Sequence, residues 1–316
     1  MGHLKENQTR INEFLLMAIS PTWESQAILF AVFLLVYAST IVGNSLIMLT
    51  VTSDLRLQTP MYFLLGNLSF VDLCYSTVTT PKILVDLLSK KKSISFDACM
   101  AQLFFLHFVG ATEMFLLTIM AYDRYVAICK PLHYPNIMNR QLCSWLVAAS
   151  WTGGFIHSTV QLVLTIGLPY CGPNQLDNFF CDVPPVIKLA CTDTYVTELL
   201  IVSNSGLISI SCFVILVASY ATILVRIRSP EGRRKALNVC ASHLMVVTLF
   251  FGPCIFIYGG PLSTISVDKL TPVLYNINII TPMLNPLIYT LRNKDVKSAI
   301  RKLTGKETIS DGKVDM

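Results

Sequence analysis

The chain has 316 residues, of which 53% are hydrophobic and only 14% are charged, and its formal net charge is +5. This amount of charge cannot cover the surface of a water-soluble protein of this length, so the composition excludes a soluble globular fold and indicates that lipid covers much of the surface. The small positive excess favours segments that face a cytoplasmic membrane surface over binding to nucleic acid.

Seven apolar windows follow one another along the chain. A helix that crosses a hydrocarbon core of about 30 Å needs about 20 mostly apolar residues, and each window reaches that length. Charged residues occur only in the second and third windows. We therefore predict an all-α integral membrane protein with a bundle of seven transmembrane helices. In chain order the windows cover residues 28–51, 61–88, 98–128, 142–168, 199–225, 236–262 and 270–291.

The basic residues predict the orientation of this bundle, which we expect to extend over residues 25–291. An odd number of spans places the two termini on opposite sides of the membrane. If the N-terminus is outside, the inner segments hold 16 of the 24 Lys and Arg residues, as cytoplasmic loops do. Residues 1–24 then form an extracellular tail in which Asn7 begins the sequon Asn-Gln-Thr, and we expect glycosylation at Asn7.

Residues 292–316 are expected to form the cytoplasmic end of the chain. Val296, Ile300 and Leu303 fall on one face of a helix there, opposite several basic residues. This pattern predicts a short amphipathic helix on the inner leaflet, followed by a tail. The alternative interpretation is a solvated basic tail.

Four of the ten cysteines, Cys99, Cys171, Cys181 and Cys191, fall on the predicted outer side, where oxidation to disulfides is possible. Four cysteines permit three pairings. Cys99 opens the third window, so a bond from it to the long outer loop would hold that loop over the helical bundle.

Two carboxylates lie in the middle of predicted spans, Asp72 in the second and Glu113 in the third, without a Lys or Arg at comparable depth. Unpaired acids in a medium of low dielectric constant must hold a proton or share a cation. Asn44 and Asn285, in the first and seventh windows, can complete an oxygen-rich site that suits a sodium ion. The alternative is a pair of neutral, hydrogen-bonded acids.

The adjacent pair Asp123 and Arg124 lies at the inner end of the third window. Neighbouring side chains on a helix diverge, so Arg124 can point into the bundle while Asp123 holds it locally. A buried arginine that exchanges partners is a plausible switch, and Tyr220 and Tyr289 are candidate alternative partners. Helix-breaking prolines such as Pro286 lie where bending would open an inner cleft.

The outer half of the predicted bundle offers a set of small, polar and aromatic residues that would line a mostly apolar cavity. Such a cavity suits a small neutral molecule, because it contains no acid that could pair with an amine. Ordinary helix packing is the alternative for any single residue. The set is His107, Gly110, Ala111, Asn204, Ser205, Phe251, Ile255, Tyr258 and Asn278.

Several ordered motifs carry a family resemblance. They include residues 57–63 (LQTPMYF), 120–129 (MAYDRYVAIC), 235–244 (KALNVCASHL) and 282–293 (PMLNPLIYTLRN). Together they resemble the olfactory (odorant) receptor family of rhodopsin-like G protein-coupled receptors over nearly the whole chain. Asn-Pro or Asp-Arg-Tyr alone is a weak signal, whereas the ordered set is specific.

The resemblance implies a multi-pass plasma-membrane receptor that needs no cofactor, with an odorant pocket between spans three, five and six. It also implies coupling to a stimulatory G protein that raises cyclic AMP, and it supports the sodium interpretation of Asp72 and Glu113. The implied disulfides are Cys99–Cys181 and Cys171–Cys191. The implied residues for coupling and switching are Asp123, Arg124, Tyr125, Tyr220, His243, Asn285, Pro286 and Tyr289.

Three other classes of protein fit the sequence less well. A transporter or channel predicts an inverted repeat or a continuous polar path, and neither is visible in the sequence. A receptor for an amine or peptide is disfavoured by the apolar outer cavity. An enzyme is disfavoured because no nucleophile, base and orienting group converge at an accessible depth.

Overall fold

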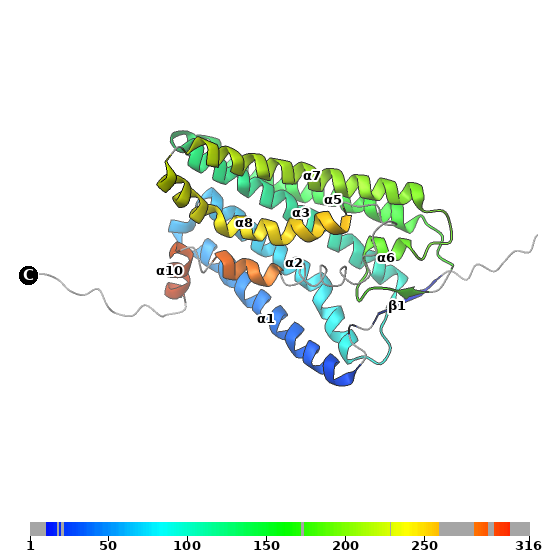
Figure 1. The fold of residues 1–316 in the computed structure, drawn as a ribbon. Helices are drawn as coiled ribbons and strands as arrows, with labels where there is room; N and C mark the ends of the chain where they lie inside the picture. Colours follow the sequence, from blue (N-terminus) through cyan, green and yellow to red (C-terminus); the bar gives the residue numbers. More distant parts are fainter. Residues whose placement is uncertain are drawn as a thin grey trace, which may run out of the picture.

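The computed structural model describes residues 11–17, 19, 22–171, 174–227, 229–258, 281–289 and 294–303. Within these ranges six long helices form a bundle, which Figure 1 shows along its length. The helices are α1 (Trp23–Ser53), α2 (Pro60–Leu88), α3 (Phe96–Cys129), α5 (Arg140–Ile166), α7 (Tyr195–Arg226) and α8 (Pro230–Tyr258).

The predicted windows agree with these helices. Each of the first six windows falls on one long helix, within a few residues at its ends. The seventh window, 270–291, is helical over residues 281–289, and the rest of it lies outside the described residues. By length and composition alone, α1, α3 and α7 are long and apolar enough to cross a membrane.

Side-chain caps explain why several of the helices begin where they do. Thr22 precedes α1 and accepts a hydrogen bond from the backbone N–H of Ser25. Ser95 caps α3 in the same way, and Asn139 caps α5 by accepting from the backbone N–H of Leu142 at 2.8 Å. These caps satisfy N–H groups that have no partner inside their own helix.

Helix α3 is the centre of the bundle. In its most apolar stretch 61% of the residues are buried inside the protein, against 11% for α1, so α3 packs on protein along much of its length and α1 does not. It contacts α2, α5 and α7. The contact with α5 is close at Gly154, where an added Cβ would lie 2.4 Å from Oγ1 of Thr112 and 2.7 Å from the carbonyl oxygen of Phe108.

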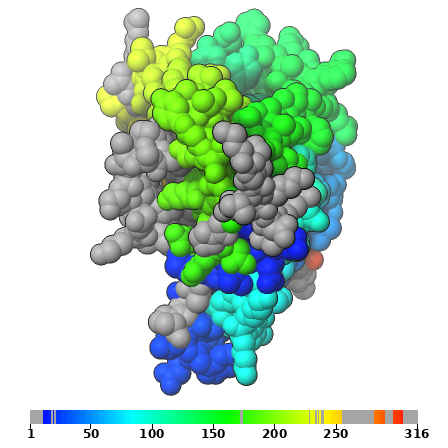
Figure 2. Space-filling view, turned by 90° about the vertical axis from the view of Figure 1, so that its right-hand side faces the viewer, coloured from blue at the N-terminus to red at the C-terminus, as the bar shows by residue number. Residues whose placement is uncertain are grey.

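A small sheet covers the outer end of the bundle. Strand β1 (Glu13–Leu16) pairs antiparallel with β2 (Ser93–Ser95) and parallel with β3 (Gln175–Leu176). Figure 2 views the molecule from this end and shows the dark blue N-terminal segment between cyan and green segments. Part of the polar tail expected over residues 1–24 is therefore held in place by a strand.

The core beneath this sheet is aromatic. The side chain of Phe14 is completely buried, and its ring lies 5.8 Å from that of Phe96 and 6.2 Å from that of Tyr170. Alternation of buried and partly buried residues along β1 explains how so short a strand is held.

Short elements connect the long helices at both ends. Helix α10 (Lys294–Leu303) lies at the inner end and packs on α1, with Val296 and Ala299 buried and Leu303 exposed. The remaining short elements are η1 (Leu55–Leu57), η2 (Pro131–His133), α4 (Tyr134–Ile137) and α6 (Val183–Ile187).

Candidate functional site

A cavity lies in the outer half of the bundle, between α2, α3, α5, α7 and α8. Its empty volume is about 550 Å³, counted with the space that opens to solvent. The lining residues are Tyr75, Leu106, His107, Gly110, Ala111, Met114, His157, Ser205, Ile208, Ser209, Phe250 and Cys254.

The outer loop reaches this cavity through a disulfide. Cys99, in the first turn of α3, is bonded to Cys181, and Cys171 is bonded to Cys191 within the loop. The side-chain oxygen of Gln102 accepts from the backbone N–H of Cys181 at 2.9 Å, which fixes the loop against α3 a second time. The loop therefore forms a tethered cover over the outer end of the bundle.

Asp182, next to the tethered cysteine, contacts the histidine of α3. Nε2 of His107 lies 3.0 Å from Oδ1 of Asp182, and both side chains are buried. The same carboxylate oxygen accepts from the backbone N–H of Val183 at 2.7 Å. The carboxylate of Asp182 is thus engaged by the protein itself and is not presented to the cavity as a lone charge.

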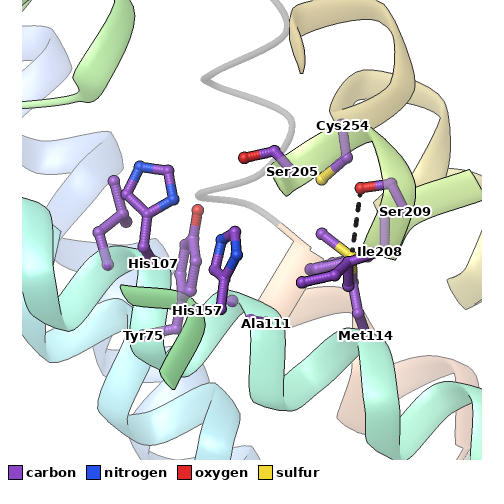
Figure 3. Close-up of a pocket in the computed structure, with 12 residues that line it drawn as sticks. Tyr75, His107, Ala111, Met114, His157, Ser205, Ile208, Ser209 and Cys254 are labelled. Atoms are coloured by element: carbon purple, nitrogen blue, oxygen red, sulfur yellow. Dashed lines mark hydrogen bonds between the residues drawn. The ribbon is translucent and has the colours of Figure 1, made fainter. Parts of the chain in front are cut away.

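A second histidine, His157 of α5, faces His107 with ring centroids 5.8 Å apart. The side-chain amide of Asn204 donates to its Nδ1 at 3.1 Å, so the hydrogen of the neutral imidazole is at Nε2. Within the described chain this Nε2 has no hydrogen-bond partner, and the ring lines the cavity. Figure 3 shows both histidines beside Tyr75.

The hydroxyl of Ser205 on α7 accepts a hydrogen bond from Nε2 of Gln161 at 2.6 Å. Its own hydrogen is therefore available to a ligand. In Figure 3 this hydroxyl points toward the side of the cavity that holds the two histidines.

The other side of the cavity is apolar and rich in sulfur. Its surface comes from Met114, Ile208, Phe250 and Cys254. The one hydroxyl on this side, that of Ser209, donates to Sδ of Met114 at 3.5 Å, drawn as the dashed line in Figure 3. The cavity thus has a polar side and an apolar side.

The residues predicted for this cavity fall into three groups. His107, Gly110, Ala111 and Ser205 line it, and Asn204 lies behind the ring of His157. Phe251 was expected in the wall but is completely buried against Phe213 and Phe250, because its ring points into the packing between α7 and α8. The side chains of Ile255 and Tyr258, and residue Asn278, lie outside the described residues, as does Asn7.

Sequence reasoning missed the contribution of α5. His157 and Gln161 are four residues apart in a window without any charged residue, so they share one face of the helix. Both are buried, and each hydrogen-bonds to α7. Polar side chains at that spacing in an apolar span are the signal that would have identified this wall. The other missed lining residues are Tyr75, Leu106, Met114, Ile208, Ser209, Phe250 and Cys254.

A second polar cluster lies deeper in the bundle. The side-chain amide of Asn285 donates to both oxygens of Asp72 at 3.0 Å, and Glu113 of α3 lies within electrostatic range of both. Asn44 donates to the carbonyl oxygen of Pro282 at 2.9 Å. All four side chains are buried.

Close packing of α1 on the helical segment 281–289 holds Asn44 and Asn285 near each other. An added Cβ at Gly43 would lie 3.0 Å from Cβ of Pro286, so a larger residue would require Pro286 to shift. Pro286, predicted as a helix-breaking residue, is buried at this contact.

Three oxygen atoms of the polar cluster lack partners among the residues that the structure describes. They are Oδ1 of Asn44, Oε1 of Glu113 and Oδ1 of Asn285. Buried oxygen acceptors without donors are costly unless a cation or a water molecule satisfies them. With the carboxylate of Asp72 they form a set of hard oxygen ligands, which fits a sodium ion.

At the inner end of α3 the structure corrects one expectation. Asp123 was expected to hold Arg124, but the described residues contain no ion pair between the two side chains. Oδ1 of Asp123 accepts from the hydroxyl of Tyr134 at 2.8 Å, whereas Nη2 of Arg124 contacts Sδ of Met61. Neighbouring positions on a helix point in different directions, so each side chain finds a partner on a different element.

The candidate partners of Arg124 lie nearby. The hydroxyl of Tyr220 on α7 hydrogen-bonds to Nδ1 of His243 on α8, and both lie within electrostatic range of Arg124. The hydroxyl of Tyr289 and Nε2 of His243 are buried and have no partner within the described part of the chain.

Tyr125 occupies the edge of this inner cluster. It is partly exposed, with its ring 6.2 Å from that of Tyr122 and the ammonium group of Lys130 5.9 Å above it. It also packs against the buried cluster formed by Val126, Met138 and Cys143.

Comparison with known proteins agrees with this architecture. A family model described as "Olfactory receptor" matches residues 33–306. Human olfactory receptor 4Q2 is 69% identical over 303 residues, covering 95% of this chain and 96% of that protein. Mouse olfactory receptor 4E2 is 59% identical, covering 96% and 98%, and human olfactory receptor 4E1 is 57% identical, covering 95% and 96%.

The apolar helices and the family match together define a seven-helix membrane receptor. The chain belongs to the olfactory receptor family. It is therefore a multi-pass plasma-membrane protein and an odorant receptor, not an enzyme, and the predicted fold class is confirmed.

Proposed function

We propose that this receptor binds a small, mainly apolar odorant in the outer cavity and activates a stimulatory G protein, which raises cyclic AMP. One observation carries the proposal: a single helix, α3, contributes to all three clusters. It places His107, Ala111 and Met114 in the cavity wall, Glu113 in the polar core, and Arg124 at the inner end.

The proposed activation mechanism depends on the contribution of α3 to all three clusters. A ligand that fits the cavity better in one arrangement of α3, α7 and α8 shifts a pre-existing equilibrium toward that arrangement. The contact of Tyr220 with His243 joins α7 to α8 beside Arg124, so a movement of α8 changes what surrounds the arginine. Opening of the inner ends of α3, α7 and α8 would then expose a surface for the G protein.

Sodium has a place in this proposal. Asp72, Glu113, Asn44 and Asn285 would hold the ion, which supplies positive charge to buried oxygens. An ion held between α1, α2, α3 and the segment 281–289 stabilises one arrangement of these helices. Its release would accompany the change to the other.

The orientation of the termini is part of the same proposal. Strand β1 and helix α10 lie at opposite ends of the bundle (Figure 1), which supports an extracellular N-terminus and a cytoplasmic C-terminus. Removal of N-linked glycans should lower the apparent mass of the receptor, and Asn7→Gln should give the lower mass directly. A C-terminal epitope that is stained in intact cells would contradict this orientation.

A cyclic AMP reporter in cells that express the receptor, screened against a broad panel of odorants, tests the proposed coupling. We expect responses that require the receptor and disappear in cells that lack the stimulatory G protein. Odorant-driven current in such cells would favour an ion channel instead.

A further inference from the structure

The polar side of the cavity presents hydrogen-bond donors. Nε2 of His157 carries a hydrogen because Asn204 donates to the other ring nitrogen. The hydroxyl of Ser205 has a hydrogen to give because its oxygen already accepts from Gln161. Tyr75, which also lines the cavity, carries a further hydroxyl group that can donate.

The cavity offers little to an ionised ligand. The described lining residues include no Lys, Arg, Asp or Glu. The nearest acid, Asp182, is engaged by His107 and by the backbone N–H of Val183. An ammonium group would therefore lose its hydration without gaining a carboxylate, and a carboxylate ligand would find no fixed cation on this surface.

The apolar side of the cavity favours a different part of the ligand. Met114, Ile208, Phe250 and Cys254 offer no strong donor, and the hydroxyl of Ser209 is used by the sulfur of Met114. A hydrocarbon portion of the ligand fits this side because its burial removes apolar surface from water.

We infer that the receptor selects neutral odorants with a carbonyl-type oxygen, such as ketones, aldehydes and esters, and that His157 and Ser205 determine this specificity. The inference rests on the proposed odorant site and names the chemical class that it takes. A carbonyl oxygen has two lone pairs, so it can accept from both donors at once, while the hydrocarbon body lies against Met114 and Phe250. A ligand without an acceptor leaves both donors unpaired in a dry cavity, which weakens its binding.

Matched ligands test this directly. The probes are methyl ketones and methyl esters of about six to ten carbons, small neutral molecules of the class that such sites bind. Each ketone is compared with the alkane in which a methylene replaces the carbonyl, and each ester with the alkane of equal length. Both are also compared with the amine and the carboxylic acid of equal length. Binding is measured as ligand-induced stabilisation of the purified full-length receptor, and signalling as cyclic AMP in cells. We expect ketones and esters to act at concentrations roughly tenfold or more below the matched alkanes, because two neutral hydrogen bonds are lost.

Two serines on α7 provide matched variants. Ser205→Ala removes a donor that faces the ligand, and we expect it to raise the half-maximal concentration of ketones roughly three- to tenfold, as loss of one neutral hydrogen bond does. Ser203→Ala, which removes an exposed hydroxyl of the same helix outside the cavity lining, should leave the preference for ketones over alkanes unchanged.

His157 is tested by a pair of substitutions. His157→Phe keeps an aromatic ring but removes the donor, and the preference for ketones should shrink. His157→Gln keeps an N–H donor and should retain most of the preference, which separates the loss of the donor from a failure to fold.

The outcomes distinguish the inference from the proposed function. Stabilisation of the purified receptor by ketones without a cyclic AMP response would support the inference and contradict the proposed coupling. Cyclic AMP responses that are as strong to alkanes, amines or acids as to carbonyl compounds would overturn the inference and leave the coupling intact. Absence of stabilisation by every ketone and ester would also overturn the inference.

Discussion

The side-chain amide of Asn285 donates to both carboxylate oxygens of Asp72 at 3.0 Å, across 213 residues of sequence. This contact joins α2 to the helical segment 281–289. It also orients the amide oxygen of Asn285 away from Asp72, where it has no partner within the described residues.

The polar core leads to a prediction about sodium. Asp72→Asn removes the carboxylate with the smallest change in volume, and we expect it to abolish stabilisation of the purified receptor by sodium chloride relative to potassium chloride at equal ionic strength. The reason is the loss of a charged oxygen ligand. The thermal unfolding midpoint in each salt is the measurement.

A matched variant elsewhere serves as the control for that experiment. Asp86→Asn also removes an acid of α2, but this acid is paired with Lys82. It should therefore keep the response to sodium. An equal sodium response in the Asp72→Asn receptor would remove the proposed ion site.

Because α3 and α5 approach closely at Gly154, one added methyl group there should lower the stability of the receptor. Gly154→Ala places a Cβ 2.7 Å from the backbone carbonyl of Phe108, which cannot move aside as a side chain can. Overpacking of this kind costs about 1–3 kcal/mol, so the thermal midpoint should fall. Gly206→Ala on α7 is the control: nothing lies within 4 Å of its added Cβ, and the midpoint should stay the same or rise.

The inner arginine predicts a loss of signalling without a loss of folding. Arg124→Ala should abolish the odorant-evoked rise in cyclic AMP while the amount of receptor at the cell surface, measured with an N-terminal epitope, remains. Arg140→Ala, which removes an exposed charge at the start of α5, should keep the response. Normal signalling by the Arg124→Ala receptor would show that the switch lies elsewhere.

The N-terminal strand carries a pH-dependent contact. Glu13 pairs with Lys91 at 2.6 Å, and the hydrogen bond and charge of Lys91 hold the pKa of Glu13 below its ordinary value of 4.5. A lowered pKa means that the stabilisation is complete above 4.5 and is lost as the pH falls through the lower pKa of the folded state.

Glu13→Gln removes the negative charge of this contact, so the small difference in thermal midpoint between it and the unmodified receptor should be present near neutral pH and vanish in acid. Asp97→Asn, which removes an exposed acid at the start of α3, should not reproduce this dependence. A difference that grows in acid would contradict the assignment to Glu13.

The spans were predictable because lipid demands long apolar runs, and six of the seven windows coincide with helices. Pairs on one helix, such as Asp123 with Arg124, were predicted less well. Proximity in sequence suggested that they contact, whereas Tyr134 and Met61 turn out to be their partners. Those partners lie on other elements, and no local pattern indicates them.

The residues of the cavity were also predicted only in part. His107, Ala111 and Ser205 were identified because polar or small residues stand out in apolar spans. Phe251 was misplaced because the direction in which an aromatic ring packs depends on its neighbours, here Phe213 and Phe250. His157 was missed although its spacing from Gln161 places two polar side chains on one face of α5, and both of them hydrogen-bond to α7.

Strand β1 makes the assembly of the outer surface depend on the order of synthesis. Its contacts reach Lys91 and Asn174, which follow Glu13 by 78 and 161 residues. The first segment to be made can therefore pair with β2 early, but its sheet and the aromatic packing around Phe14 are completed only after β3 and Tyr170 have been made. A fusion or epitope tag inserted after Ile11 would interfere with the strand pairing of β1. A tag that ends before Ile11 leaves this pairing intact.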